Sequence, residues 1–233
     1  MFQRIKNLKA SHILLLLLTA DLFYILLHIF HKVPIIEHSI PIFEDEAFSI
    51  SQDRGLAESF SYIQELWIAL LFGWLIFKHR KPQYTVWSLL FVYFLGDDMF
   101  GIHEWMGDHL GPLFGSLFAN TPLKELKLDS VGELAGLALV GLTFFLILYL
   151  SYRKSDPQTQ RAFRITTLLV ALLLFFGVAL DFADTLLPNI EKLKAMARLV
   201  EDGGEMLAMS LILWYTYLLA GMDSAQPAGI SAL

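Results

Sequence analysis

The chain has 233 residues, of which 56% are hydrophobic and only 17% are charged, whereas an ordinary soluble domain carries roughly 25% charged residues. Its net charge of −6 excludes a general nucleic-acid binder, which needs a basic face, and its lack of cysteine excludes disulfides, thiolate metal sites and cysteine nucleophiles. This composition is typical of an integral membrane protein whose partners include membrane lipids and no nucleic acid.

Six segments have the length of roughly 20 largely apolar residues that a helix needs to cross a bilayer. They predict an all-α integral membrane protein with about six transmembrane helices in one domain, residues 1–222, followed by a short cytoplasmic tail, 223–233. The first segment begins like a signal peptide, but it runs on through Asp21 to Phe30 without a small-residue cleavage site, so we expect a retained helix. The predicted spans are 11–31, 60–77, 84–104, 130–152, 162–186 and 198–220.

The loops indicate an orientation in the membrane. The N-terminal segment and the loops around 78–81 and 153–164 are short and basic, which is typical of cytoplasmic loops, and the acidic segment 32–54 then lies outside. We therefore expect both termini in the cytoplasm and the protein in the plasma (inner) membrane. Residues 110–118 are apolar, contain Gly and Pro and are too short to span, so they form either an interfacial or re-entrant piece over the outer mouth or an ordinary loop on the headgroups. Residues 35–50 are likewise either a lid or an ordinary loop.

A weak internal repeat links the helices. Each inward-running helix places a Glu near its outer end, at Glu65, Glu133 and Glu205, ahead of an apolar run, and each outward-running helix carries an Asp at a matching place. The pattern favours three pseudo-repeated helical hairpins. The competing explanation is that apolar helices resemble one another by composition alone.

On this topology the acids and histidines of all six helices lie in the outer half of the membrane. At 1.5 Å per residue, Asp98 and Asp181 lie about 25 Å, and Glu65 about 20 Å, from the inner boundary of a hydrocarbon core about 30 Å thick. Isolated acids are unfavourable at such depths, so we expect them to face inward and share protons, cations or hydrogen bonds. The candidate ligands are Asp21, His28, Glu65, Asp97, Asp98, His103, Glu104, Glu133, Asp181, Glu201 and Glu205.

The helical spacing predicts convergence of these groups. Asp97, Gly101, Glu104 and Asp108 would form one stripe on the third predicted helix. A layer rich in carboxylates suits a divalent metal ion such as Ca²⁺, Mg²⁺ or Mn²⁺, and participation of a histidine would admit Fe or Zn.

The leading hypothesis is an outer-leaflet carboxylate and histidine site that binds a cation or protons for transport or sensing. One alternative is an intramembrane metal-dependent enzyme acting on a lipid or another membrane substrate, and a second is a structural or assembly subunit whose acids only fix helix packing. A transporter also needs a polar route to the cytoplasm, for which the sequence offers few residues. The oligomeric state is left open.

Overall fold

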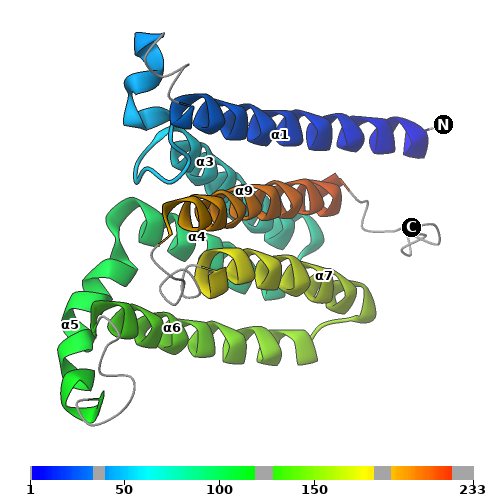
Figure 1. Cartoon of the computed structure of the whole chain (residues 1–233). Coiled ribbons are helices and arrows are strands. Elements are labelled where there is room, and N and C mark those ends of the chain that lie inside the picture. Colours follow the sequence, from blue (N-terminus) through cyan, green and yellow to red (C-terminus); the bar gives the residue numbers. More distant parts are fainter. Residues whose placement is uncertain (1, 34–39, 119–127, 181–189, 222–233) are drawn as a thin grey trace.

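The regular structure is entirely helical throughout the described part of the chain. The computed structural model describes residues 2–33, 40–118, 128–180 and 190–221 (Figure 1). Short 3-10 helices lie at Pro41–Glu44 (η1), Glu46–Phe48 (η2) and Pro82–Tyr84 (η3), and a π-helical turn at Phe175–Leu180 (η5). The α-helices are α1 (Phe2–Lys32), α3 (Leu56–His79), α4 (Thr85–Phe100), α5 (Ile102–Phe118), α6 (Leu128–Arg153), α7 (Pro157–Leu174) and α9 (Glu191–Gly221).

Several of these helices have the length and apolar composition to cross a membrane. Five qualify on their own, and a sixth is obtained if the bent pair formed by α4 and α5 is taken as one span. The prediction of an all-helical chain with several apolar, membrane-compatible helices is therefore confirmed. The five segments are Ala10–Lys32, Leu56–His79, Ser130–Arg153, Pro157–Leu180 and Leu193–Gly221.

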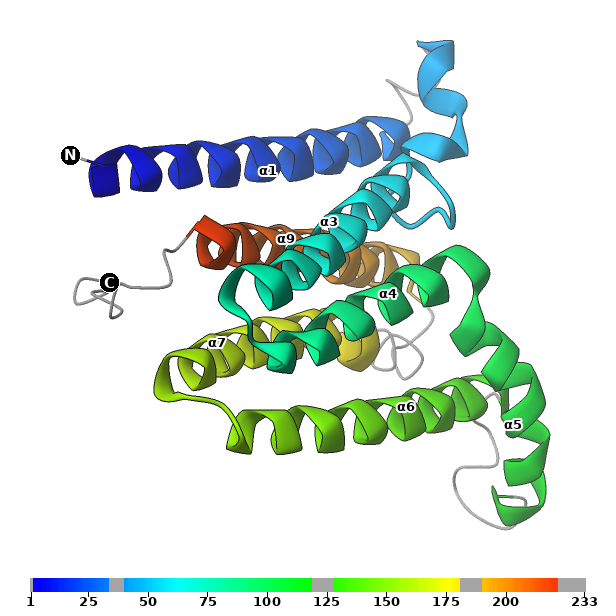
Figure 2. The ribbon, with the colours of Figure 1, turned by 180° about the vertical axis from the view of Figure 1, so that it is seen from behind.

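The long helices lie side by side along one direction, and α5 lies across one end of the bundle (Figures 1 and 2). Helix α9 is central and contacts α1, α3 and α7, and the fully buried rings of Phe72 and Trp87 and the side chain of Ile212 form part of the core between the helices. Helix α6 is peripheral and packs chiefly against α5: 6% of its apolar segment is buried, whereas 56% of the apolar segment of α9 is buried. The helices therefore do not pack as three equivalent pairs.

The third predicted helix differs most from its expected form. Instead of running from 84 to 104, α4 ends at Phe100, where Gly101 adopts a left-handed conformation with φ of 61°, and α5 starts at an angle of 77° to α4. The side chain of Asp97 stabilises this corner, because its Oδ1 accepts a hydrogen bond of 2.7 Å from the His103 backbone N–H at the start of α5. The prediction of a stripe of acids along a single helix is therefore wrong, since these residues are divided between two helices.

Other helix boundaries also differ from the predicted ones. Helix α3 begins four residues earlier than the predicted start at 60, and α9 begins at Glu191 instead of 198, so both reach further toward the acidic end. Segment 110–118 is the second half of α5 and remains helical around Pro112. The predicted end of the fifth span, 181–186, lies outside the described residues, as does the tail 223–233.

Glycine residues allow helices α5 and α6 to cross with their backbones in close contact. A Cβ atom added to Gly132 would lie 2.5 Å from the backbone oxygen of Gly107 and 2.5 Å from the backbone nitrogen of Gly111. Gly107 and Gly111, four residues apart on α5, face Gly132 on α6, and Gly136 lies against the Met106 side chain; small residues at such positions allow two helix backbones to approach this closely. This contact fixes α5 across the end of the bundle.

At the opposite end of the bundle, an ion pair joins the connection from α3 to α4 to the connection from α6 to α7. Lys81 Nζ lies 2.8 Å from Asp156 Oδ2 and donates a 2.8 Å hydrogen bond to Thr159 Oγ1, while Asp156 also accepts from the backbone N–H groups that begin α7. Partial burial opposes ionisation of Asp156, but the hydrogen bonds from Lys81 and Thr159 outweigh it and hold the pKa of this carboxyl well below its usual range. The connection between α3 and α4 is thereby tied to the start of α7.

Candidate acidic cavity

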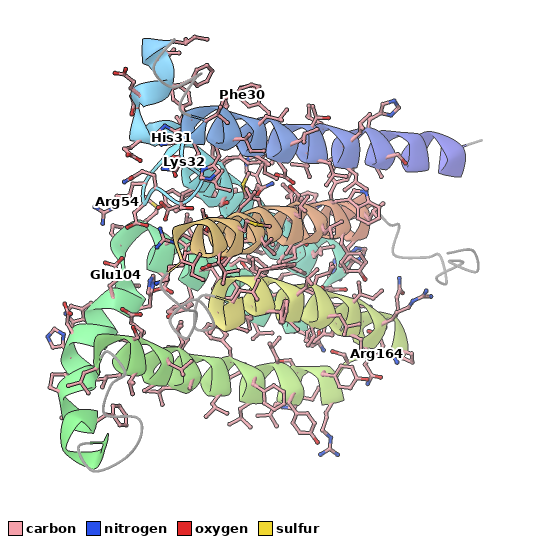
Figure 3. The ribbon with its side chains drawn as sticks, in the orientation of Figure 1. Phe30, His31, Lys32, Arg54, Glu104 and Arg164 are labelled. Atoms are coloured by element: carbon pink, nitrogen blue, oxygen red, sulfur yellow. The ribbon has the colours of Figure 1, made fainter. Side chains whose placement is uncertain are left out.

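A cavity of about 520 Å³ lies at the end of the bundle crossed by α5. Its walls come from α3, α4, α5, α6, the end of α7, η5, α9 and the segment 50–53. Glu104, labelled in Figure 3, lies at this end, whereas Arg164 lies at the opposite end. The acids that line the cavity are Asp53, Glu58, Glu65, Asp97, Asp98, Glu104, Glu133, Glu201, Asp202 and Glu205.

Most of the candidate ligands identified from the sequence border this one cavity. The structure places eight of them on its wall and leaves Asp21 and His28 away from it, while Asp181 lies outside the described residues. Three lining acids, Asp53, Glu58 and Asp202, were not among the candidates. The eight are Glu65, Asp97, Asp98, His103, Glu104, Glu133, Glu201 and Glu205.

Glu65 is the most deeply buried acid on the wall. Its side chain is 1% exposed, it reaches the cavity from the middle of α3, and its carboxyl group hydrogen-bonds to that of Asp98 on α4. A hydrogen bond between two carboxyl groups requires one of them to carry a proton. The second oxygen of Glu65, Oε2, has no hydrogen-bond partner among the described residues. The pair therefore has acceptor capacity left over for a ligand in the cavity.

Glu205 reaches the cavity beside an irregular turn. A Cβ atom added to Gly177 would lie 2.1 Å from Glu205 Oε1, and one added to Gly204 would lie 2.2 Å from Cδ1 of Phe176. The π-helical turn η5 therefore packs directly on α9 at the level of Glu205. Single π-helical turns inside α-helices are frequently found at functional sites.

Asp97 and His103 form a separate pair at the corner between α4 and α5. His103 Nδ1 lies 3.2 Å from Asp97 Oδ1, the same oxygen that accepts from the His103 backbone N–H. Asp97 is buried and His103 is half-buried. Because one oxygen serves both contacts, this pair has a clear structural role in shaping the corner as well as a place on the cavity wall.

The described residues contain no group of three or more His, Asp or Glu side chains already arranged to hold a metal ion. The acids are distributed around the wall instead of converging on one point. The predicted divalent metal stays a prediction.

Comparison with known proteins places the chain in a family. A family model described as "Domain of unknown function (DUF8692)" matches residues 12–220. The chain belongs to this family. The match spans every residue that lines the cavity, so the cavity is part of the DUF8692 domain itself. No curated protein and no solved structure matched the chain.

The two remaining candidates in the DUF8692 domain lie on α1. Asp21, midway along the apolar segment of this helix, is fully buried next to Ser210 of α9, whose hydroxyl accepts a 2.8 Å hydrogen bond from Gln64 Nε2. His28 Nδ1 accepts a 3.2 Å hydrogen bond from the backbone N–H of Ile50, which anchors the segment before α3 on α1. Neither residue lines the cavity: both carboxyl oxygens of Asp21 are buried without a hydrogen-bond partner among the described residues, and His28 holds the segment that borders the outer wall.

Proposed function

We propose that this protein is an integral membrane protein that binds a cation or protons in the acidic cavity, for transport or sensing. The observation that carries the proposal is Glu65, an almost completely buried carboxyl on the cavity wall with one unpartnered oxygen, paired with Asp98. Ionisable groups buried inside a membrane domain are costly and are most often functional.

The membrane setting is supported by the outward faces of the helices. Phe77, Leu168 and Leu139 are 78%, 70% and 65% exposed, and such side chains recur on α1, α4 and α6. Apolar surface of this extent is unfavourable in water and favourable in lipid. The six-span description takes α4 and α5 as one span broken at Gly101.

The proposed orientation places both termini in the cytoplasm and the cavity at the outer face of the plasma membrane. Lys78, Arg80 and Lys81 lie around the connection from α3 to α4, and Arg153 and Lys154 lie around the connection from α6 to α7. Arg164 lies at the end of the bundle opposite the cavity, whereas Lys32 and Arg54 lie at the cavity end (Figure 3). The three Glu residues of the proposed hairpin repeat, Glu65, Glu133 and Glu205, all line the cavity, which is the feature that a repeat around one site would produce.

The test is to remove one ionisable group from the buried pair. Glu65→Gln keeps the shape and much of the hydrogen bonding of the side chain but removes its ability to become a carboxylate when a cation binds. In lipid nanodiscs, we expect Ca²⁺ or Mn²⁺ to raise the melting temperature of the native protein by mass action, or proton uptake to do so between pH 8 and 5. Glu65→Gln should weaken that response roughly 10-fold or more, because charged ligands dominate the affinity for hard cations.

The matched control is Glu44→Gln, which removes an exposed acid outside the cavity. It should leave the cation and proton responses unchanged. A lower melting temperature for Glu65→Gln with an unaltered cation and proton response would defeat the proposal and leave a purely structural network. Elemental analysis of the purified protein addresses the metal-dependent enzyme alternative, since stoichiometric iron, zinc or manganese would favour it.

A further inference from the structure

On three helices, α4, α6 and α9, the wall of the cavity changes from polar to apolar with depth. On α6 and α9, which run in the same direction from the acidic end, an acid is followed one turn later by an apolar residue on the wall: Glu133 by Leu137 and Glu205 by Met209. Four residues correspond to about 6 Å along a helix, and positions four apart share one face. On these two helices the apolar side chain therefore lines the wall deeper than the acid, whereas on α3 the apolar Ala57 lies outward of Glu65.

Helix α4 repeats the arrangement in reverse. It runs toward the acidic end, and on it Phe94 precedes Asp98 by four residues, so the apolar residue again lies deeper. At the end of α7, Leu173 likewise lines the wall before the chain reaches Gly177 of η5. We call Phe94, Leu137, Leu173 and Met209 the apolar floor.

The cavity is also larger and more acidic than a bare ion requires. A volume of about 520 Å³ is within the range of roughly 300–1,000 Å³ that small-molecule pockets occupy. Among the described residues that line it, none is Lys or Arg, and the one histidine, His103, is paired with Asp97. A metal ion needs oxygen ligands and gains nothing from an apolar floor, whereas an organic cation uses both parts.

We infer that the ligand of this cavity is an organic ammonium compound, with its cationic head among Glu65, Asp98 and Glu205 and its hydrocarbon stem against the apolar floor. The inference rests on the proposed function, cation binding in this cavity, and adds the chemical class of the cation. The acids alone do not carry it; the buried and unpartnered Oε2 of Glu65 is the independent sign of a missing hydrogen-bond donor. An ammonium group supplies such donors together with a positive charge.

The test uses 4-phenylbutylamine as the probe, with the protein in nanodiscs of neutral phosphatidylcholine so that anionic lipid does not attract the amine. Two controls separate head from stem: 4-phenyl-1-butanol has the stem without charge, and methylamine has the charge without stem. Empty nanodiscs correct for partition into lipid. Binding is measured by calorimetric titration and by the shift in melting temperature.

We expect the amine to bind at least about 10-fold more tightly than either control, since each buried methylene contributes about 4-fold in Kd. Glu65→Gln should weaken amine binding by roughly 10-fold or more, because one partner of a buried charge pair is lost. Leu137→Ser should weaken the amine by about 4-fold or more and leave methylamine unchanged. Its matched control is Leu139→Ser, two residues along α6 on a 65% exposed side chain that does not line the cavity.

The outcomes separate the two proposals. Equal binding of amine and alcohol, or loss of amine binding in Leu139→Ser as large as in Leu137→Ser, overturns the organic-ammonium inference. Binding of Ca²⁺ or Mn²⁺ that depends on Glu65, with no preference for the amine, also overturns it while the proposed cation site survives. No response to amine, metal ion or pH defeats both.

Discussion

The crossing of α5 and α6 should not tolerate even one added methyl group. In Gly132→Ala the new Cβ would lie 2.5 Å from two backbone atoms of α5 and 2.9 Å from a third, the Cα of Gly111. Ordinary contact begins near 3.4 Å, so the two backbones must separate by about 0.9 Å. Such overpacking typically costs about 1–3 kcal/mol of stability, because neither helix backbone can rotate out of the way as a side chain does.

Gly141→Ala is the matched control on the same helix. A Cβ at Gly141 meets nothing within 4 Å, so this variant keeps only the gain of up to about 1 kcal/mol that alanine brings to a helix. Because that gain is common to both variants, their difference isolates the clash. At about 2–4 °C per kcal/mol for a chain of this size, Gly132→Ala should melt about 2–12 °C below Gly141→Ala in nanodiscs. Equal melting temperatures would refute the close backbone contact.

Two further predictions concern the ion pair of Asp156 and the orientation of the chain in the membrane. The lowered pKa of Asp156 means that its ionised form stabilises the fold above the ordinary aspartate pKa of about 3.9, and that this contribution is lost as the pH falls below that value. Asp156→Asn, which keeps the helix cap but loses the ion pair with Lys81, should therefore melt below the native protein at pH 6, with a gap that narrows by pH 3; a constant gap would contradict the ion pair. For the orientation, Glu44→Cys should react with an impermeant thiol reagent added outside intact cells and Lys154→Cys should not, and the reverse pattern would put the cavity on the cytoplasmic side.

The membrane-compatible helices were predictable because their signal is long and redundant. Some 20 apolar residues in a row leave few alternatives, and α1, α3, α6 and α9 each contain the span that hydropathy predicted for them. The position of many acids on the wall of one cavity was foreseeable for a related reason: charged groups at similar depths in apolar helices must face a shared interior. Glu58 could have been added by spacing, since it precedes Glu65 by seven residues, about two turns, on one helix face.

The corner at Gly101 was not predictable by the same reasoning. Apolar residues stand on both sides of Gly101 among the acids, so the apolar pattern does not mark the turn, which depends on one left-handed glycine and on the reach of the Asp97 side chain. The same limit applies to α5, whose glycines meet those of α6 from a distant part of the sequence. Local patterns report which residues are apolar; they do not report which two helices pack together.

The weak attachment of α6 has a consequence for how the molecule opens. Regions with few buried apolar contacts open at lower free energy than the global unfolding, and amide hydrogen exchange reports such openings. Little of α6 is buried, and it packs chiefly against α5. We therefore expect α5 and α6 to swing away as one unit before the amide hydrogens of α3 or α9 exchange with solvent. That movement would carry Glu104 and Glu133 with it and remove one wall of the cavity.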